Sequence, residues 1–79
     1  MADVGSARAV LRTLVKESPH TAKHVAAQVG EEYTTFIHRI NGRRTSYLNL
    51  DLSFVFAVLR TIGVPFTEYA RRVEEADRG

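Results

Sequence analysis

Cysteine and tryptophan are absent from this chain of 79 residues, and proline occurs only twice. Without cysteine there can be no disulfide bond and no thiolate metal site, so the fold must depend on packing. No apolar run approaches the roughly 18 residues of a membrane-spanning helix, and the first residues lack the apolar core of a secretory signal. We therefore expect a protein of the reducing cytoplasm that has no membrane partner.

The chain has little excess of charge of either sign. It contains 11 Lys and Arg residues and 9 Asp and Glu residues, which gives a net charge of +2. The distribution is less even than the total. Residues 33–50 contain three arginines, one histidine and no acid. This segment predicts a local positive patch, whereas the mixed charges of the last third are typical of a solvated helix surface.

Hydrophobic residues make up 44% of the chain, which favours a folded globule over a disordered segment. The length corresponds to a single domain, residues 1–79. Apolar residues recur with helical spacing in five segments, and no segment alternates as a strand does. The expected helices span approximately residues 6–17, 22–29, 33–40, 52–62 and 65–73. The expected fold class is an all-α, compact five-helix bundle.

Each expected helix has an apolar face that should point into the core. On the third helix this face consists of Tyr33, Phe36, Ile37 and Ile40. On the fourth it consists of Leu52, Val55, Leu59 and Ile62, widened by Phe56 and Val58, with Phe54 left on the other side. On the fifth it consists of Phe66, Tyr69, Ala70 and Val73. Asp51 is the expected N-cap of the fourth helix, and Gly63 its expected C′ residue.

The second and third expected helices form the most informative stretch, residues 21–44. Thr21 is a good N-cap, because its hydroxyl can accept a hydrogen bond from a free backbone N–H. Gly30 stands where a helix would end in a left-handed residue, a conformation that glycine adopts without steric cost. Two cations, Arg43 and Arg44, follow the third helix. Two short helices, a glycine turn and terminal cations predict a helix-turn-helix with its core at about residues 21–42.

From about Val10 to Val73 the chain resembles the lambda-repressor-like helix-turn-helix family, also called Cro-type or XRE. Three features carry the resemblance. Val25, Ala26 and Gly30 are similar to the family's apolar-Ala-turn-Gly pattern, INGRR at residues 40–44 is similar to its L-N-G-K-R ending, and residues 52–64 and 64–73 look like its fourth and fifth helices. The resemblance implies a DNA-binding fold with the third helix as recognition helix.

Three positions depart from the family pattern. Ala22 stands where the family usually has a phosphate-contacting Gln, Glu31 replaces an apolar residue after the turn glycine, and Glu32 replaces a Ser or Thr cap. Carboxylates near the start of a helix suit its dipole, but DNA phosphates would repel them if the two faced each other.

If the apolar face of the third helix points inward, its remaining side chains point outward and can read base edges in a major groove. The candidate base contacts are Thr34, Thr35, His38 and Arg39. The candidate phosphate contacts are Lys23, Arg43, Arg44, Thr45 and Ser46. The alternative is an ordinary solvated helix face. Arg39 could equally extend to the backbone, and for Lys23 a solvated lysine is equally compatible with the sequence.

Catalysis and metal binding find no support in the sequence. His20 and His24 are one helical turn apart, but a zinc site needs a third or fourth ligand. No Ser-His-Asp arrangement, phosphate-binding glycine loop or carboxylate pair in an apolar frame is present. We expect no enzyme activity, no metal and no cofactor.

The sequence thus predicts a sequence-specific double-stranded DNA-binding protein, a small transcriptional regulator of the repressor type. A homodimer would double its few contacts and read a palindrome. The candidate dimer surface comprises Tyr47, Leu48, Leu50, Phe54 and the fifth helix. The alternative is a protein–protein interaction module, antitoxin-like or adaptor-like, that uses the same fold.

Overall fold

The computed structural model describes residues 4–41 and 51–78. These residues form five helices: α1 (Val4–Glu17), α2 (Ala22–Gln28), α3 (Tyr33–Asn41), α4 (Leu52–Ile62) and α5 (Phe66–Arg78). Within the two described ranges all regular secondary structure is helical, which confirms the predicted all-α class. The radius of gyration is 11.7 Å, close to the value of about 11.6 Å expected for a compact chain of this length.

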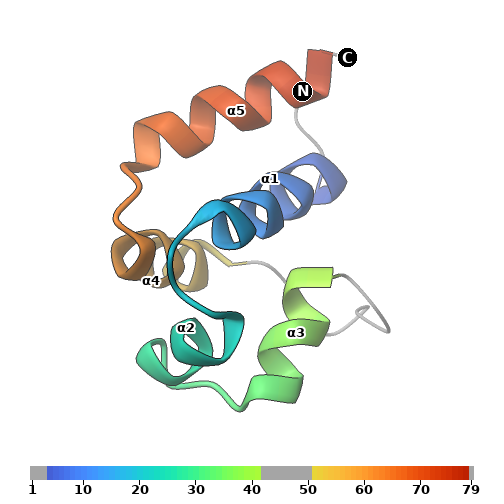
Figure 1. Ribbon diagram of the computed structural model, residues 1–79. Coiled ribbons are helices and arrows are strands. Elements are labelled where there is room, and N and C mark those ends of the chain that lie inside the picture. The colour runs from blue at the N-terminus through green and yellow to red at the C-terminus, as the bar shows by residue number, and fades with distance from the viewer. Residues whose placement is uncertain (1–3, 42–50, 79) are drawn as a thin grey trace.

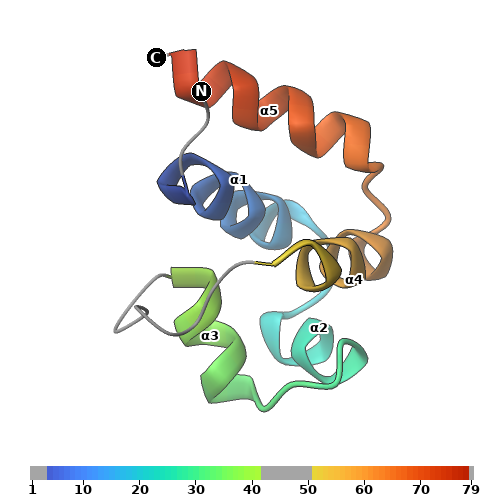
Figure 2. The same cartoon turned by 180° about the vertical axis from the view of Figure 1, so that it is seen from behind.

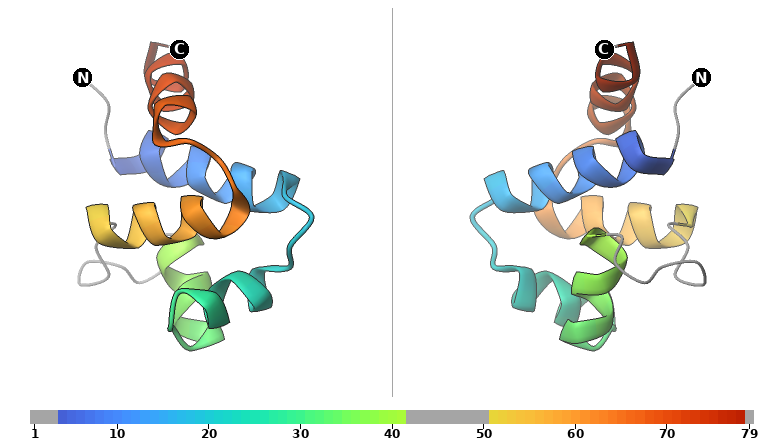
Figure 3. Two further views of the ribbon diagram at one scale, coloured as in Figure 1. Left: turned by 90° about the vertical axis from the view of Figure 1, so that its left-hand side faces the viewer. Right: turned by 90° about the vertical axis from the view of Figure 1, so that its right-hand side faces the viewer.

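The helices are stacked from one end of the molecule to the other (Figure 1). α5 lies across α1 at one end, and α2 and α3 lie together at the opposite end. Between them, α4 lies beside α1 and above α2, as the reverse view also shows (Figure 2). α1 is the central helix, because it packs against α3, α4 and α5 (Figure 3).

The core is entirely apolar among the described residues, and every helix contributes to it. Leu11, Phe36 and Val58 are completely shielded from solvent. Burial of such side chains is the main favourable term in folding. The buried set is Val10, Leu11, Leu14, Val15, Val25, Ala26, Phe36, Ile40, Phe54, Val55, Val58, Leu59, Ile62, Tyr69 and Val73.

Capping residues begin α2 and α4, and end α2, at the positions that the sequence predicts. The Thr21 hydroxyl accepts a hydrogen bond from the His24 N–H at 3.0 Å, and the Asp51 carboxylate accepts one from the Phe54 N–H at 2.7 Å. Gly30 has a φ of +79°. The N–H groups of Gly30 and Glu31 donate to the carbonyls of Ala27 and Ala26, respectively, which is the Schellman arrangement.

α5 is joined to α1 by a long-range hydrogen bond. The Tyr69 hydroxyl donates to the Ala7 carbonyl at 3.1 Å, and the ring of Tyr69 is buried. Burial raises the pKa of the Tyr69 phenol, because it penalises the charged phenolate. The contact therefore pairs a polar group with its partner while the ring fills the core.

Six of the expected core assignments are wrong: Phe54 is buried, whereas Tyr33, Leu52, Phe56, Phe66 and Ala70 are exposed. Phe54, expected on the other side of its helix, is buried, because its ring packs against Phe36 of α3 at 5.8 Å between centroids. Tyr33 and Leu52 are 47% and 58% exposed, since each is the first residue of its helix and precedes the turns that carry the buried side chains. Phe56 and Phe66 are also exposed, and their rings contact each other at 4.9 Å.

Among the helices of residues 4–41 and 51–78, none combines the length and the apolar character needed to cross a bilayer.

Replacing the buried ring of α3 should destabilise the protein strongly. We expect Phe36→Ala to lower the free energy of unfolding by about 3–5 kcal/mol, because it removes a fully buried aromatic side chain and leaves a cavity. Urea titration followed by circular dichroism measures this. Tyr33→Ala, an aromatic truncation at an exposed position of the same helix, should change the value by less than about 1 kcal/mol. Equal losses in both variants would contradict this description of the core.

Candidate nucleic-acid interface

The candidate interface is built by α2 and α3, which are packed together and connected by residues 29–32. Ala26 of α2 is 1% exposed, and its small side chain permits close approach of the neighbouring helix. After the left-handed Gly30, Glu32 precedes α3, and its carbonyl accepts the N–H of Phe36 at 2.9 Å. The glycine turn therefore sets the direction in which α3 leaves α2.

The buried residues of α3 determine which of its side chains are accessible. Phe36 and Ile40 are buried, and Ile37 is packed partly against the core. Thr34 is exposed, whereas Thr35 and His38 are half-buried. At 100° per residue these three positions fall within one third of the helix circumference, opposite Phe36 and Ile40. They form a polar face, which we call the α3 face (Thr34, Thr35 and His38).

Arg39 does not share that outward direction, in contrast to the expectation. It follows Phe36 by three positions and lies at the edge of the buried side of α3. Its side chain is only 17% exposed, and its guanidinium lies 3.4 Å from the Glu31 carboxylate and 4.0 Å from that of Asp51. The guanidinium carbon is 4.7 Å from the centre of the Phe54 ring. The structure therefore places Arg39 against α4, and its base contact stays a prediction.

The structure describes only one of the predicted phosphate contacts. Lys23 is exposed on α2. Arg43, Arg44, Thr45 and Ser46 lie outside the described residues, as do three members of the expected dimer surface, Tyr47, Leu48 and Leu50. The fourth member, Phe54, is buried and cannot form a dimer contact without rearrangement.

His20 and His24 stack on each other, with 5.0 Å between ring centres and 15° between ring planes. In the described part of the chain, no three His, Cys, Asp or Glu side chains lie close enough together to hold a metal ion.

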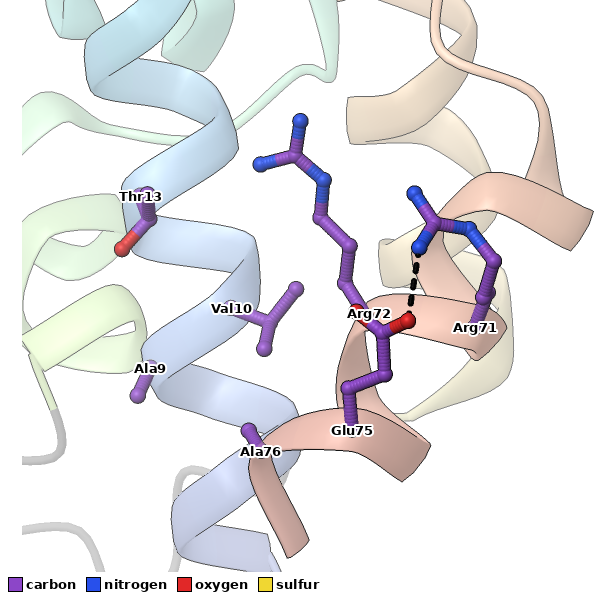
Figure 4. A pocket seen from close by; sticks show the side chains of 7 residues that line it. All are labelled: Ala9, Val10, Thr13, Arg71, Arg72, Glu75 and Ala76. Carbon is purple, nitrogen blue, oxygen red and sulfur yellow. Dashed lines mark hydrogen bonds and ion pairs between the residues drawn. The ribbon is translucent and has the colours of Figure 1, made fainter. Parts of the chain in front are cut away.

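A hollow of about 600 Å³ lies between α1 and α5 (Figure 4). Arg71 and Arg72 of α5 border it, facing Val10 and Thr13 of α1. Both guanidinium groups are already bound to carboxylates. Arg71 contacts Glu68 at 2.7 Å and Glu75 at 2.8 Å. Arg72 contacts Glu68 at 2.9 Å and Glu17 at 3.1 Å.

This cluster of charges does not favour a nucleic-acid contact, because two arginines face three carboxylates. Hydrogen bonds from Arg72 and Arg71 lower the pKa of the Glu68 carboxyl from its ordinary value of 4.5. The same bonds raise the pKa of both guanidinium groups. We call these ion pairs the α5 network (Glu17, Glu68, Arg71, Arg72 and Glu75). They stabilise α5 and, through Glu17, connect it to α1.

Comparison with protein family models, with curated proteins and with solved structures gave no match. The function is therefore argued from the residues of this chain.

Sequence reasoning missed the contacts of Arg39 and the exposed aromatic pair of Phe56 and Phe66. A signal for the first was present, because Glu31 is an acid at a position where the resembled family has an apolar residue. No local pattern signals the second, since helical periodicity does not tell which side of a widely apolar helix stays uncovered.

The α5 network should make stability depend on acid pH through Glu68. Because its pKa is lowered on folding, Glu68 contributes stability above pH 4.5, and this contribution is lost as the pH falls through the lower folded-state pKa. Urea unfolding at several pH values should therefore show wild type more stable than Glu68→Gln near neutral pH, with the difference disappearing in acid.

The matched control is Glu74→Gln, which removes a carboxylate from a more exposed ion pair to Arg78 on the same helix. We expect a smaller difference from wild type for this variant. A Glu68→Gln difference that stayed constant down to strongly acidic pH would contradict the role given to this carboxylate.

Proposed function

We propose that this chain is a helix-turn-helix protein of the lambda-repressor-like type that binds double-stranded DNA sequence-specifically, as a small transcriptional regulator of the repressor type. The observation that carries the proposal is the α3 face. It is a short polar helical surface, held by Phe36 and Ile40 at one end of the molecule, with the packed helix α2 beside it.

The dimensions of α3 suit a major groove. An α-helix with its side chains is about 10–12 Å in diameter, which fits a major groove about 12 Å wide, and the nine residues of α3 extend for about 13 Å. The hydroxyls of Thr34 and Thr35 can hydrogen-bond to base edges, and their methyl groups can contact thymine methyls. His38 can donate a hydrogen bond to a base acceptor or a phosphate.

Binding to the backbone would come from the cations around α3. Lys23 is exposed on α2, and Arg43 and Arg44, with Thr45 and Ser46, follow α3 in the chain. Phosphate contacts fix the register of the protein on DNA and supply the salt-dependent part of the affinity. With few such contacts in one copy, a homodimer that reads two half-sites about 34 Å apart completes the proposal.

The test is selection of bound sequences from a labelled, randomised duplex pool, with fluorescence anisotropy between about 50 and 200 mM salt. Salt-sensitive binding together with an enriched palindrome supports the proposal. Absence of binding at low salt would overturn it.

Removing the threonines of the α3 face should relax sequence preference. For Thr34→Ala combined with Thr35→Ala, we expect each lost base contact to reduce discrimination by about 1–3 kcal/mol at its own base pair, with little change in binding to random duplexes. The measurement is anisotropy with the selected site and with single-base variants of it. Thr13→Ala, which removes a threonine from α1 at the hollow beside α5, is the control and should retain full discrimination.

Removing Lys23 should instead weaken binding to all duplexes alike. We expect Lys23→Ala to reduce the slope of log affinity against log salt by about 1, because one phosphate contact is lost. Arg78→Ala removes an equal charge from α5, at the far end of the molecule, and should leave the slope closer to that of wild type. Identical slopes for wild type and Lys23→Ala would exclude Lys23 as a phosphate contact.

A second candidate function is protein–protein interaction, antitoxin-like or adaptor-like. It is favoured by exposed apolar side chains on α4 and α5, namely Leu52, Phe56 and Phe66. The two candidates differ in their response to Phe56→Ser. If Phe56→Ser loses binding to a partner protein while its DNA affinity is unchanged, the protein-interaction function is favoured. A dimeric DNA reader that uses this surface would instead lose affinity for the palindrome and keep its affinity for a single half-site.

A further inference from the structure

Arg39 occupies a position that neither a base-reading nor a solvated arginine requires. It lies on α3 directly after His38 of the α3 face, yet its guanidinium is turned toward α4. Three groups surround it: the Glu31 carboxylate at 3.4 Å, the Asp51 carboxylate at 4.0 Å and the face of the Phe54 ring at 4.7 Å. These groups come from three segments, namely the turn before α3, the N-cap of α4 and the first turn of α4.

Within this cluster the pair of Arg39 and Glu31 is shielded from water, whereas the Asp51 side chain is 62% exposed. The side chains of Arg39 and Glu31 are 17% and 20% exposed. Arg39 Nε and Glu31 Oε1 are each inaccessible to solvent. In such surroundings the removal of one partner leaves the other charge uncompensated, which costs more than the loss of an exposed pair.

The geometry also suits the arginine side chain in particular. A planar, delocalised guanidinium can lie over an aromatic ring while its N–H groups face carboxylates, whereas a lysine ammonium provides a compact point charge. Phe54 is itself fixed, because it is 6% exposed and packs against Phe36. The Arg39 guanidinium therefore lies against the Phe54 ring of the core and close to the carboxylates of Glu31 and Asp51.

We propose that Arg39 is a positioning residue of the α3 face rather than a base contact. It holds α3 against the start of α4 and neutralises Glu31, the acid next to the first turn of α3. This inference rests on the proposed DNA-binding function. An unpaired Glu31 would bring a negative charge to the end of the recognition helix and would be repelled by DNA phosphates.

The proposal makes Glu31 the residue through which Arg39 acts, so a double-mutant cycle tests it. The variants are Arg39→Gln, Glu31→Gln and the combination of both. The control is Glu32→Gln, which removes an acid at the neighbouring, exposed position. The readouts are affinity for the selected duplex and the sequence enriched from a randomised pool.

We expect Arg39→Gln to weaken binding about tenfold while enriching the same sequence as wild type. The combined variant should regain most of that affinity, beyond any gain that Glu32→Gln shows from the loss of one negative charge. A changed base preference in Arg39→Gln, or no recovery in the combined variant, would overturn the proposal and return Arg39 to the base contacts.

A measurement without DNA separates this inference from the proposed function. Hydrogen exchange at the amides of residues 36–40 should be faster in Arg39→Gln than in wild type, since α3 loses one of its links to α4 and keeps the packing of Phe36 against Phe54. If wild type binds no duplex, the DNA-binding proposal fails, and faster exchange still supports the positioning role. Unchanged exchange would overturn the positioning role whether or not DNA binds.

Discussion

The contact between the rings of Phe36 and Phe54 is the interaction on which the arrangement of the candidate interface depends. Phe36 is wholly buried, and Phe54 reaches it from α4 at 5.8 Å between ring centroids. A helix can in principle rotate about its own axis. Placing one large side chain inside the core fixes that rotation. Once Phe36 points inward, Thr34 and His38 must point outward, and Arg39 must lie at the edge, next to Phe54.

The two ends of the molecule use charge differently. At the α5 end, Arg71 and Arg72 are bound to three carboxylates, and this network holds α5 in place without a net positive surface. At the α3 end, the pair of Arg39 and Glu31 cancels one positive and one negative charge. Under the proposed function, affinity for DNA at this end would therefore rely on the exposed Lys23 and on the arginines that follow α3 in the chain.

Sequence patterns were sufficient for the features that local chemistry determines. Thr21 and Asp51 cap their helices, and Gly30 and Gly63 are left-handed, because hydroxyls, carboxylates and glycine have intrinsic preferences at these positions. Element number and class followed from helical periodicity. All of these features depend on residues within a few positions of each other.

Features that depend on which helix lies opposite could not be predicted in this way. Phe54 was assigned to the wrong side, because α4 is apolar on most of its circumference and only the position of Phe36 decides between the sides. The contact of Arg39 with Asp51 joins residues 12 positions apart, and no periodicity reports on such a pair. The sequence around Arg39 favours base reading, and only the position of α4 shows that its guanidinium lies beside Phe54 and Asp51.

The exposed aromatic pair bears on whether DNA binding and protein binding compete. Phe56 and Phe66 belong to α4 and α5, whereas the α3 face lies at the opposite end from α5. A partner or second copy that covered the aromatic pair would therefore leave the α3 face open. Burial of this pair would favour association, and under the proposed function a dimer that buried it would add a second α3 without any new base-reading residue. Under the proposed function, the same chain would thus combine a weak individual reader with the association needed to make reading selective.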